Sequence, residues 1–473
     1  MKNTDSATLS RIKGSDPLVE DHAALDEDYV LTATFVEKVV DAADDGDGQR
    51  LRSLLEDLHP ADVADLMGFL TSEHRGVVVL WLPAELLAET LPELDDGIRE
   101  EVLERVPHLI LAEALQELDS DDAAAVVEDL EDDQRERVLA AMPETDRAAI
   151  ESSLGYAEDS AGRLMQREVM AAPQFWTVGD TIDHVRGQTD DLPELFFDIY
   201  VVDPLNRPVG GVPISWLLRA KRNVKLSELM EPINEISVGT DQEEVAYIFE
   251  KYHLISAPVI DDAGRLVGQI TVDDIVNIIQ EENREDILRL AGVSDEGRDG
   301  SVMDIVRSRI PWLIINLGTA VVASSVIGLF QRQIETLVAL AVLMPIVASI
   351  GGNAGTQALT VAVRSLAARE LTAANALRIV RREVVVGLTN GVTLAVLLAG
   401  IAAIWFGKPM LSLVIGLSVI VNLFAASLAG TLIPLALDKL DRDPAVSSPV
   451  FVSWITDTVG FFVFLGLAAL VLI

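Results

Sequence analysis

The chain has 473 residues, no cysteine and a formal net charge of −39, and its length suits about three domains. From residue 301 onward there are 11 Lys/Arg and 8 Asp/Glu, so residues 1–300 hold 25 basic residues (36 minus 11) and 67 acidic ones (75 minus 8). So acidic a surface repels nucleic acid, and a chain without cysteine forms neither disulfides nor thiolate metal sites. Proteome-wide acidity in a salt-adapted organism would explain most of the charge equally well, without excluding a specific cation site.

The first third of the chain has a helical pattern. Residues 1–33 are polar and acidic without an apolar run, so we expect a disordered cytosolic tail and no signal peptide. Residues 34–161 show apolar positions at helical spacing, and acids at 119–122 mark a helix start. Because proline disfavours a helical residue before it, four prolines predict corners between short helices: Pro83, Pro92, Pro107 and Pro143. An acidic, all-α N-terminal solenoid is predicted.

Residues 162–285 contain an internal repeat. The stretch 201–212 matches 259–270, each reading as strand, Asp-containing turn and strand, followed by a helix that begins near Ser215 or Val272. Two copies of a β-α-β-β-α unit, about 163–223 and 226–285, are predicted to form a pseudo-twofold α/β pair. This repeat resembles a tandem of cystathionine-β-synthase (CBS) domains.

The last third is predicted to be an all-α polytopic membrane domain, 310–473, surrounded by lipid. Five apolar segments are long enough to span a bilayer: 310–330, 336–363, 384–406, 411–437 and 446–473. With the N-terminus cytoplasmic, nine Lys/Arg flank the spans on the inside and two on the outside, the expected positive-inside asymmetry. We therefore expect a multi-pass protein of the cell membrane with its C-terminus outside.

Asp457 is the one acid well inside a predicted span. An ionisable side chain at mid-bilayer is costly unless it faces water or a partner. It either provides an oxygen ligand for a cation in a pore or forms a structural hydrogen bond to a neighbouring helix. No basic residue lies at matching depth in the other spans, which favours the cation.

Neutral oxygens accompany this acid in two other spans. Asn353 and Gln357 are four residues apart in the second span and share one helix face, and Asn390 lies in the third. Pro345 and the Gly351-Gly352 pair are expected to loosen the backbone and turn carbonyls, such as that of Gly352, toward a cavity. The alternative is a small-residue packing face through Gly351 and Gly355. Oxygen ligands without sulfur suit Mg²⁺, Ca²⁺ or Mn²⁺.

Residues 277–309 are predicted to be a helical connector between the CBS pair and the first span, with the connecting helix itself over 286–309. Glu282, Glu285 and Asp286 share one helix face of this connector, where their mutual repulsion would be relieved by a divalent cation; an ordinary solvated face is the alternative. Thr271 and Asp274 have the Thr-x-x-Asp spacing of a site that binds a nucleotide ribose. The alternative is that Asp274 is an ordinary acid at a helix start, stabilised by the helix dipole.

Taken together, the order of segments and three motifs resemble the MgtE family of magnesium channels, over about 34–473. The motifs are the Pro to Gly-Gly-Asn-x-Gly-x-Gln stretch at 345–357, the Glu-x₃-Gly-x₂-Asn-Gly stretch at 383–391, and Asp457. The resemblance implies a homodimer with one central pore, Asp457 from both subunits at the ion site, and closure when cytosolic Mg²⁺ is plentiful. It implies a plug-like connector with Mg²⁺ bound to Glu282, Glu285 and Asp286, together with Asp274, and ATP as a further ligand of the CBS pair.

Two other functions remain open from the residues alone. A proton-coupled exporter of divalent cations would use Asp457 as its proton carrier. A non-conducting membrane metal sensor would keep Asp457 bonded to a neighbouring helix. The sequence has no ATPase loop, catalytic triad or zinc-peptidase motif, so we do not expect an enzyme.

Overall fold

The computed structural model describes residues 24–187, 192–193, 195–293, 302–371, 374–440 and 442–472. The chain divides into two compact units, Met1–Ile279 and Gln280–Ile473, each of which is described by itself. Most of the predicted tail lies outside the described residues. Its last part is a closed turn, in which Leu25 pairs with Leu31 and the Asp26 side chain accepts a hydrogen bond from Val30 N at 3.0 Å, so ordered chain begins before residue 34.

The N-terminal region is a stack of short helices, as predicted. Helix α3 packs against α5, α5 against α7 and α7 against α9, while α8 packs against α10. Pro83, Pro107 and Pro143 stand directly before α5, α7 and α10, which confirms three of the predicted corners. The helices are α1 (Ala33–Asp44), α2 (Gly48–Leu55), α3 (Pro60–Phe69), α4 (Ser72–Val79), α5 (Ala84–Thr90), α6 (Asp96–Arg105), α7 (His108–Ala114), α8 (Ser120–Glu128), α9 (Asp132–Ala141) and α10 (Glu144–Ser153).

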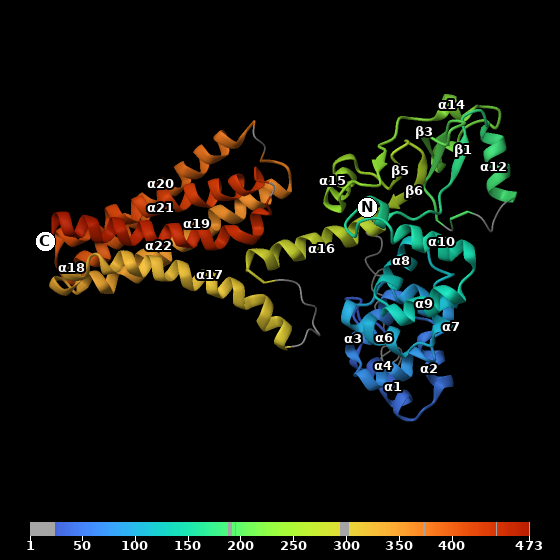
Figure 1. Ribbon diagram of the computed structural model, residues 1–473, viewed down its shortest axis with the longest axis horizontal. Helices are drawn as coiled ribbons and strands as arrows, with labels where there is room; N and C mark the ends of the chain where they lie inside the picture. Colours follow the sequence, from blue (N-terminus) through green and yellow to red (C-terminus); the bar gives the residue numbers. More distant parts are fainter. Residues whose placement is uncertain are drawn as a thin grey trace, which may run out of the picture. The chain divides into compact units, whose positions relative to one another are not determined.

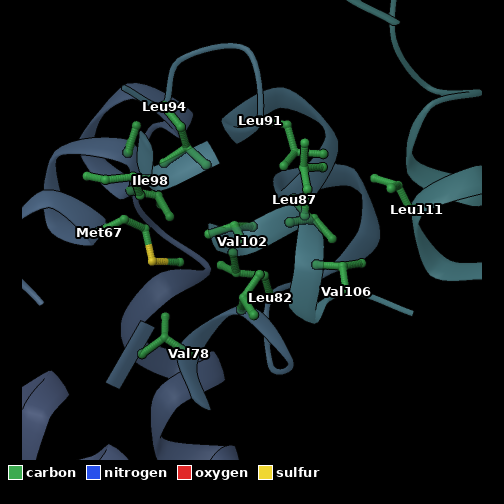
Figure 2. Close-up of a cluster of buried hydrophobic side chains, with 14 of the residues drawn as sticks. Met67, Val78, Leu82, Leu87, Leu91, Leu94, Ile98, Val102, Val106 and Leu111 are labelled. Carbon is green, nitrogen blue, oxygen red and sulfur yellow. The ribbon is translucent and has the colours of Figure 1, made fainter. Parts of the chain in front are cut away.

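One apolar core runs through this stack. Figure 2 shows side chains from successive helices meeting in it, including Met67 of α3, Val78 of α4, Leu87 of α5 and Val102 of α6, all of them buried. Since each short helix buries only one stripe, the stack rather than any single helix provides the core.

Two small sheets of identical topology follow. In each, the first strand is parallel to the second and the second is antiparallel to the third, with an irregular register at Val201/Val202 and at Val259/Ile260. The predicted β-α-β-β-α repeat is thereby confirmed. The elements are α11 (Ala161–Leu164), β1 (Ala171–Pro173), α12 (Val178–Gly187), β2 (Asp198–Val202), β3 (Pro208–Pro213), α13 (Ile214–Leu217), α14 (Leu226–Leu229), β4 (Ile236–Ser237), α15 (Gln242–Tyr252), β5 (Ser256–Ile260), β6 (Leu266–Thr271) and α16 (Val272–Leu290).

The two copies are joined by a polar chain between equivalent positions. Tyr200 Oη donates to Ser256 Oγ at 2.9 Å, and Ser256 Oγ donates to Asp198 Oδ2 at 3.0 Å. Asp198 and Ser256 start the corresponding strands β2 and β5. These hydrogen bonds tie the two CBS copies to each other.

The described part of the connector is helical as far as Leu290. The connecting helix predicted over 286–309 does not start at 286 as a separate element, because α16 begins at Val272 in the second CBS copy and continues to Leu290, followed by Gly292 at φ +69. Residues 294–301 lie outside the described part of the chain, and the next helix already begins at Val302. The connector acids are thus borne by a CBS helix.

The membrane unit contains the five long apolar helices that the hydropathy pattern predicts. Helix α21 lies at their centre, packed against α19, α20 and α22 (Figure 1), and most of its apolar stretch is buried, whereas most of α17 is exposed. The elements are α17 (Val302–Gly328), α18 (Gln331–Thr336), α19 (Ala339–Ala367), α20 (Ala376–Phe406), α21 (Pro409–Asp438) and α22 (Pro444–Val471).

Candidate functional site

Asp457 lies on α22 and is half-buried in the bundle. Within the described residues, neither a hydrogen bond nor an ion pair joins its carboxylate to another side chain. The neighbouring Thr456 is fully buried and packs against α19: its Cγ2 would lie 3.3 Å from a Cβ added at Gly355. The alternative interpretation of Asp457 was a structural hydrogen bond to a neighbouring helix, and among the described residues no such bond is formed.

Helix α19 separates its polar and small residues onto two faces. Gly351 and Gly355 are buried, and a Cβ at Gly355 would lie 2.5 Å from Val452 Cγ1 of α22. Asn353 and Gln357 are both exposed, and Gly352 is half-buried with open space beside it. Close packing therefore uses one face of the helix and leaves the amide oxygens of the other free of the bundle.

The expected loosening after Pro345 does not occur. Helix α19 continues through Pro345 and both glycines to Ala367. Proline removes a single N–H, which leaves a carbonyl unpaired one turn earlier, while packing against α21 and α22 holds the rest of the helix. The carbonyl of Gly352 accepts from Thr356 Oγ1 at 3.0 Å within the helix and does not turn away from it.

Helix α20 repeats this arrangement. Gly387 and Gly391 are buried against α21, where a Cβ at Gly387 would meet Ser427 Oγ at 2.1 Å. Asn390, between them in sequence, is exposed. The three predicted pathway amides of α19 and α20 therefore share one property: Asn353, Gln357 and Asn390 are all exposed on the surface of the single-chain bundle.

A second set of acids surrounds the start of the membrane unit. Glu282, Glu285 and Asp286 lie on α16, and Asp443 stands just before α22. We call these four the connector carboxylates. Arg289 holds two of them, because it pairs with Glu285 one turn away and with Asp443 Oδ2 at 2.7 Å. Burial, then Asp443 and Glu282, raise the pKa of Asp286, against the lowering effect of Arg289.

Asp274 belongs to a different set. It is twelve residues before Asp286 on the same helix, about 18 Å along the axis, so the two carboxylates cannot share one ion. Its neighbours are Asp273 and the first-turn acids of α8, Asp121 and Asp122. We call Asp121, Asp122, Asp273 and Asp274 the junction carboxylates.

The junction carboxylates repel one another strongly. Burial, Asp273 and Asp122 raise the pKa of Asp274 to about 7, although Thr271 lowers it. Burial, Asp119, Glu93 and Asp273 raise the pKa of Asp122 to about 6, against Arg99. Burial and Asp274 raise the pKa of Asp121 well above its usual range, and its buried Oδ1 has no hydrogen-bond partner among the described residues. A bound cation would relieve the repulsion among these carboxylates.

The sequence did not identify Asp121, Asp122, Asp273 or Asp443 as site residues. Their positions were an available signal. Two pairs of these acids lie in the first turns of helices, and Asp443 directly precedes the proline that begins α22. In the described part of the chain, no three or more His, Cys, Asp or Glu side chains already form a metal-binding arrangement.

The nucleotide prediction for Thr271 and Asp274 stays a prediction. Thr271 Oγ1 donates to Asp274 Oδ2 at 2.9 Å, so the Thr-x-x-Asp geometry is present. The adjacent acids of α8 make this position unfavourable for phosphate groups.

A CBS pair joined to five apolar spans, with a carboxylate inside the last span, is the arrangement of a polytopic membrane transport protein. Residues 344–467 match the MgtE divalent cation transporters, residues 58–159 the MgtE intracellular N domain and residues 226–281 the CBS domain. The chain belongs to the MgtE family of transporters, and is not an enzyme.

Relatives of known name cover nearly the whole chain. The magnesium transporter MgtE of Thermus thermophilus is 34% identical over 446 residues, 91% of this chain and 97% of the relative. The magnesium transporter MgtE of Bacillus subtilis is 29% identical, over 90% and 94%. A crystal structure of the cytosolic domain of the Mg²⁺ channel MgtE in complex with ATP is 35% identical, covers 51% of this chain and 99% of that one, and has a TM-score of 0.49.

Proposed function

We propose that this chain is a magnesium-selective channel of the cell membrane, which works as a homodimer around one central pore and is closed by cytosolic Mg²⁺. Its two long curated relatives are named magnesium transporters. The intracellular N domain supports a cytoplasmic N-terminus, and five spans then favour a C-terminus outside because their number is odd.

The observation that carries this proposal is the exposure of Asn353, Gln357 and Asn390 on membrane-spanning helices. A primary amide facing hydrocarbon loses its hydrogen bonds to water, at a cost of about 1–3 kcal/mol or more each. These side chains are accommodated if the exposed face of one copy meets the same face of another across a water-filled pathway.

Asp457 gives this pathway its charge preference. A carboxylate without a counterion in the described bundle attracts a cation, and amide oxygens can contact the hydration shell of that cation. Mg²⁺ gives up water reluctantly and prefers such mixed carboxylate, carbonyl and water surroundings.

Closure is assigned to the junction and connector carboxylates. Mg²⁺ shared within either set relieves the repulsion among its acids, and α16 carries members of both sets. A ligand drives a conformational change only through tighter binding to one state, so Mg²⁺ closes the pore if the assembled carboxylates bind it best. ATP at the CBS pair is retained as a second, independent proposal: the Thr271–Asp274 geometry suits its ribose, while the acids of α8 disfavour its phosphate groups at this position.

The deciding experiment is Mg²⁺ flux into liposomes containing the purified protein, with and without a pH gradient. A channel conducts Mg²⁺ without the gradient. Flux that requires the gradient indicates the proton-coupled exporter instead, and intact Mg²⁺ binding without flux indicates the non-conducting sensor.

Millimolar Mg²⁺ is expected to slow amide hydrogen exchange of α8 and the first turns of α16 in the full-length protein, because the junction carboxylates there lose their repulsion. Exchange is measured at constant ionic strength with Na⁺ replacing Mg²⁺. Equal protection by Na⁺ would show general screening and remove this site from the sensor.

The same segments should respond to pH without Mg²⁺. The raised carboxyl pKa values mean that the folded state binds more protons than the unfolded state, so protection falls as pH rises from about 4 to about 7. Mg²⁺ requires deprotonated ligands and should therefore protect more at pH 8 than at pH 5.5. Protection factors corrected for intrinsic exchange test this, and a pH-independent profile contradicts it.

A further inference from the structure

Asn422 is a fully buried amide in the middle of the apolar helix α21. Its Nδ2 donates to the carbonyl of Val347 on α19 at 3.0 Å. Its Oδ1 is buried and has no hydrogen-bond partner among the described residues. A leucine or isoleucine would fill a similar volume without leaving an acceptor unpaired, so packing alone does not explain an amide at this position.

Two glycines on different helices make room for this amide. A Cβ added at Gly351 of α19 would lie 2.1 Å from Asn422 Nδ2, and one added at Gly460 of α22 would lie 2.8 Å from the same atom. Neither position tolerates a methyl group while the amide is present. Asn422 therefore sits at the meeting point of α19, α21 and α22.

This meeting point is next to the residues of the proposed pathway. Gly460 follows Asp457 by three residues on α22, and Gly351 precedes Asn353 by two on α19. The accepting carbonyl, that of Val347, belongs to the turn of α19 that follows Pro345, while the backbone hydrogen bond that proline removes is in the turn before it. The Asn422 side chain bonds this turn to α21 and also contacts α22, so it fixes the relative position of α19 and α22.

We propose that Asn422 is a positioning residue of the ion pathway, which holds the Val347–Gly352 turn of α19 against α21 and α22 and thereby sets the separation between Asp457 and the exposed amides of α19. This inference rests on the proposed function. Since a hydrated ion is selected by the spacing of the oxygens around it, a change at Asn422 should alter selectivity more than folding.

The test uses Asn422→Ala and the double variant Gly351→Ala/Asn422→Ala in proteoliposomes. The single variant removes the bond to Val347 and leaves a small cavity, and the double variant fills that cavity with the methyl group that the amide excluded. We expect the double variant to melt within a few degrees of wild type. We also expect both variants to change the Mg²⁺ to Co²⁺ flux ratio at least threefold.

A wild-type flux ratio in both variants would overturn the proposal, as would recovery of the wild-type ratio on filling the cavity, because the role would then be steric. Gly351→Ala alone, which sets a methyl against the amide, should lose both stability and flux. Asp457→Asn, measured in the same assay, separates the proposed function from the positioning role. If Asp457→Asn loses flux while the Asn422 variants keep the wild-type flux ratio, only the positioning role of Asn422 is contradicted.

Discussion

Replacement of Asp457 by asparagine is expected to reduce Mg²⁺ flux at least tenfold while leaving the protein folded. Asparagine has nearly the same shape, and the carboxylate is half-buried without a hydrogen bond or ion pair to another described residue, so little packing is lost. What is lost is the charge within the spans that attracts a divalent cation, and a tenfold effect corresponds to about 1.4 kcal/mol. Flux into proteoliposomes and growth of cells lacking other magnesium transporters measure it.

Two variants sharpen this result. Asp457→Glu keeps the charge and should retain part of the flux. Asp438→Asn removes an equal charge from an exposed position at the end of α21 and should leave flux close to wild type. Unchanged uptake by Asp457→Asn would remove the residue from the pathway, and equal losses in both Asn variants would indicate a general charge effect.

Repeats and hydropathy were read correctly from the sequence because each is a property of one contiguous segment. The matching stretches ending at Val212 and Ile270 predicted two sheets, and both formed with the same strand order and the same register irregularity. The five spans likewise follow from the length of each apolar run.

Contacts between distant segments were not predictable in this way. Helical periodicity placed Glu282 and Asp286 on one face, but it carries no information about Asp443, which reaches them from the loop before the last span. Asp274 faces α8 for the same reason, since more than 150 residues separate it from Asp121 and only the packing of the helical stack on the CBS pair brings them together. The interpretation of Pro345 failed because tertiary packing overrides a local helix breaker.

Neutralisation of the connector acids is expected to abolish or strongly weaken closure by cytosolic Mg²⁺. The variant Glu282→Gln/Glu285→Gln/Asp286→Asn removes three of the four connector carboxylates, leaving Asp443 paired with Arg289. If these acids close the pore by holding Mg²⁺, their loss leaves it open at high Mg²⁺, whereas relief of repulsion alone would close it without metal. We expect the open outcome, because closure requires preferential binding of the ligand to the closed state.

Arg289→Gln should shift the same equilibrium in the opposite direction. Arg289 already supplies positive charge to Glu285 and Asp443, so it competes with a divalent cation for these oxygens. Its removal takes this positive charge away from both carboxylates and should lower the Mg²⁺ concentration needed for closure, by several-fold if the variant protein folds as the wild type does. Flux titrated against cytosolic Mg²⁺ measures both variants on one scale.

The matched control is Glu131→Gln/Asp132→Asn/Asp133→Asn, which makes the same charge change on exposed residues at the start of α9. Its titration curve should superimpose on that of wild type, because surface charges outside the two carboxylate sets are screened by salt. A shift equal to that of the connector variant would attribute closure to overall acidity. Curves for the connector variant and Arg289→Gln that both match wild type would exclude the connector carboxylates from the sensor and leave the junction carboxylates to account for closure.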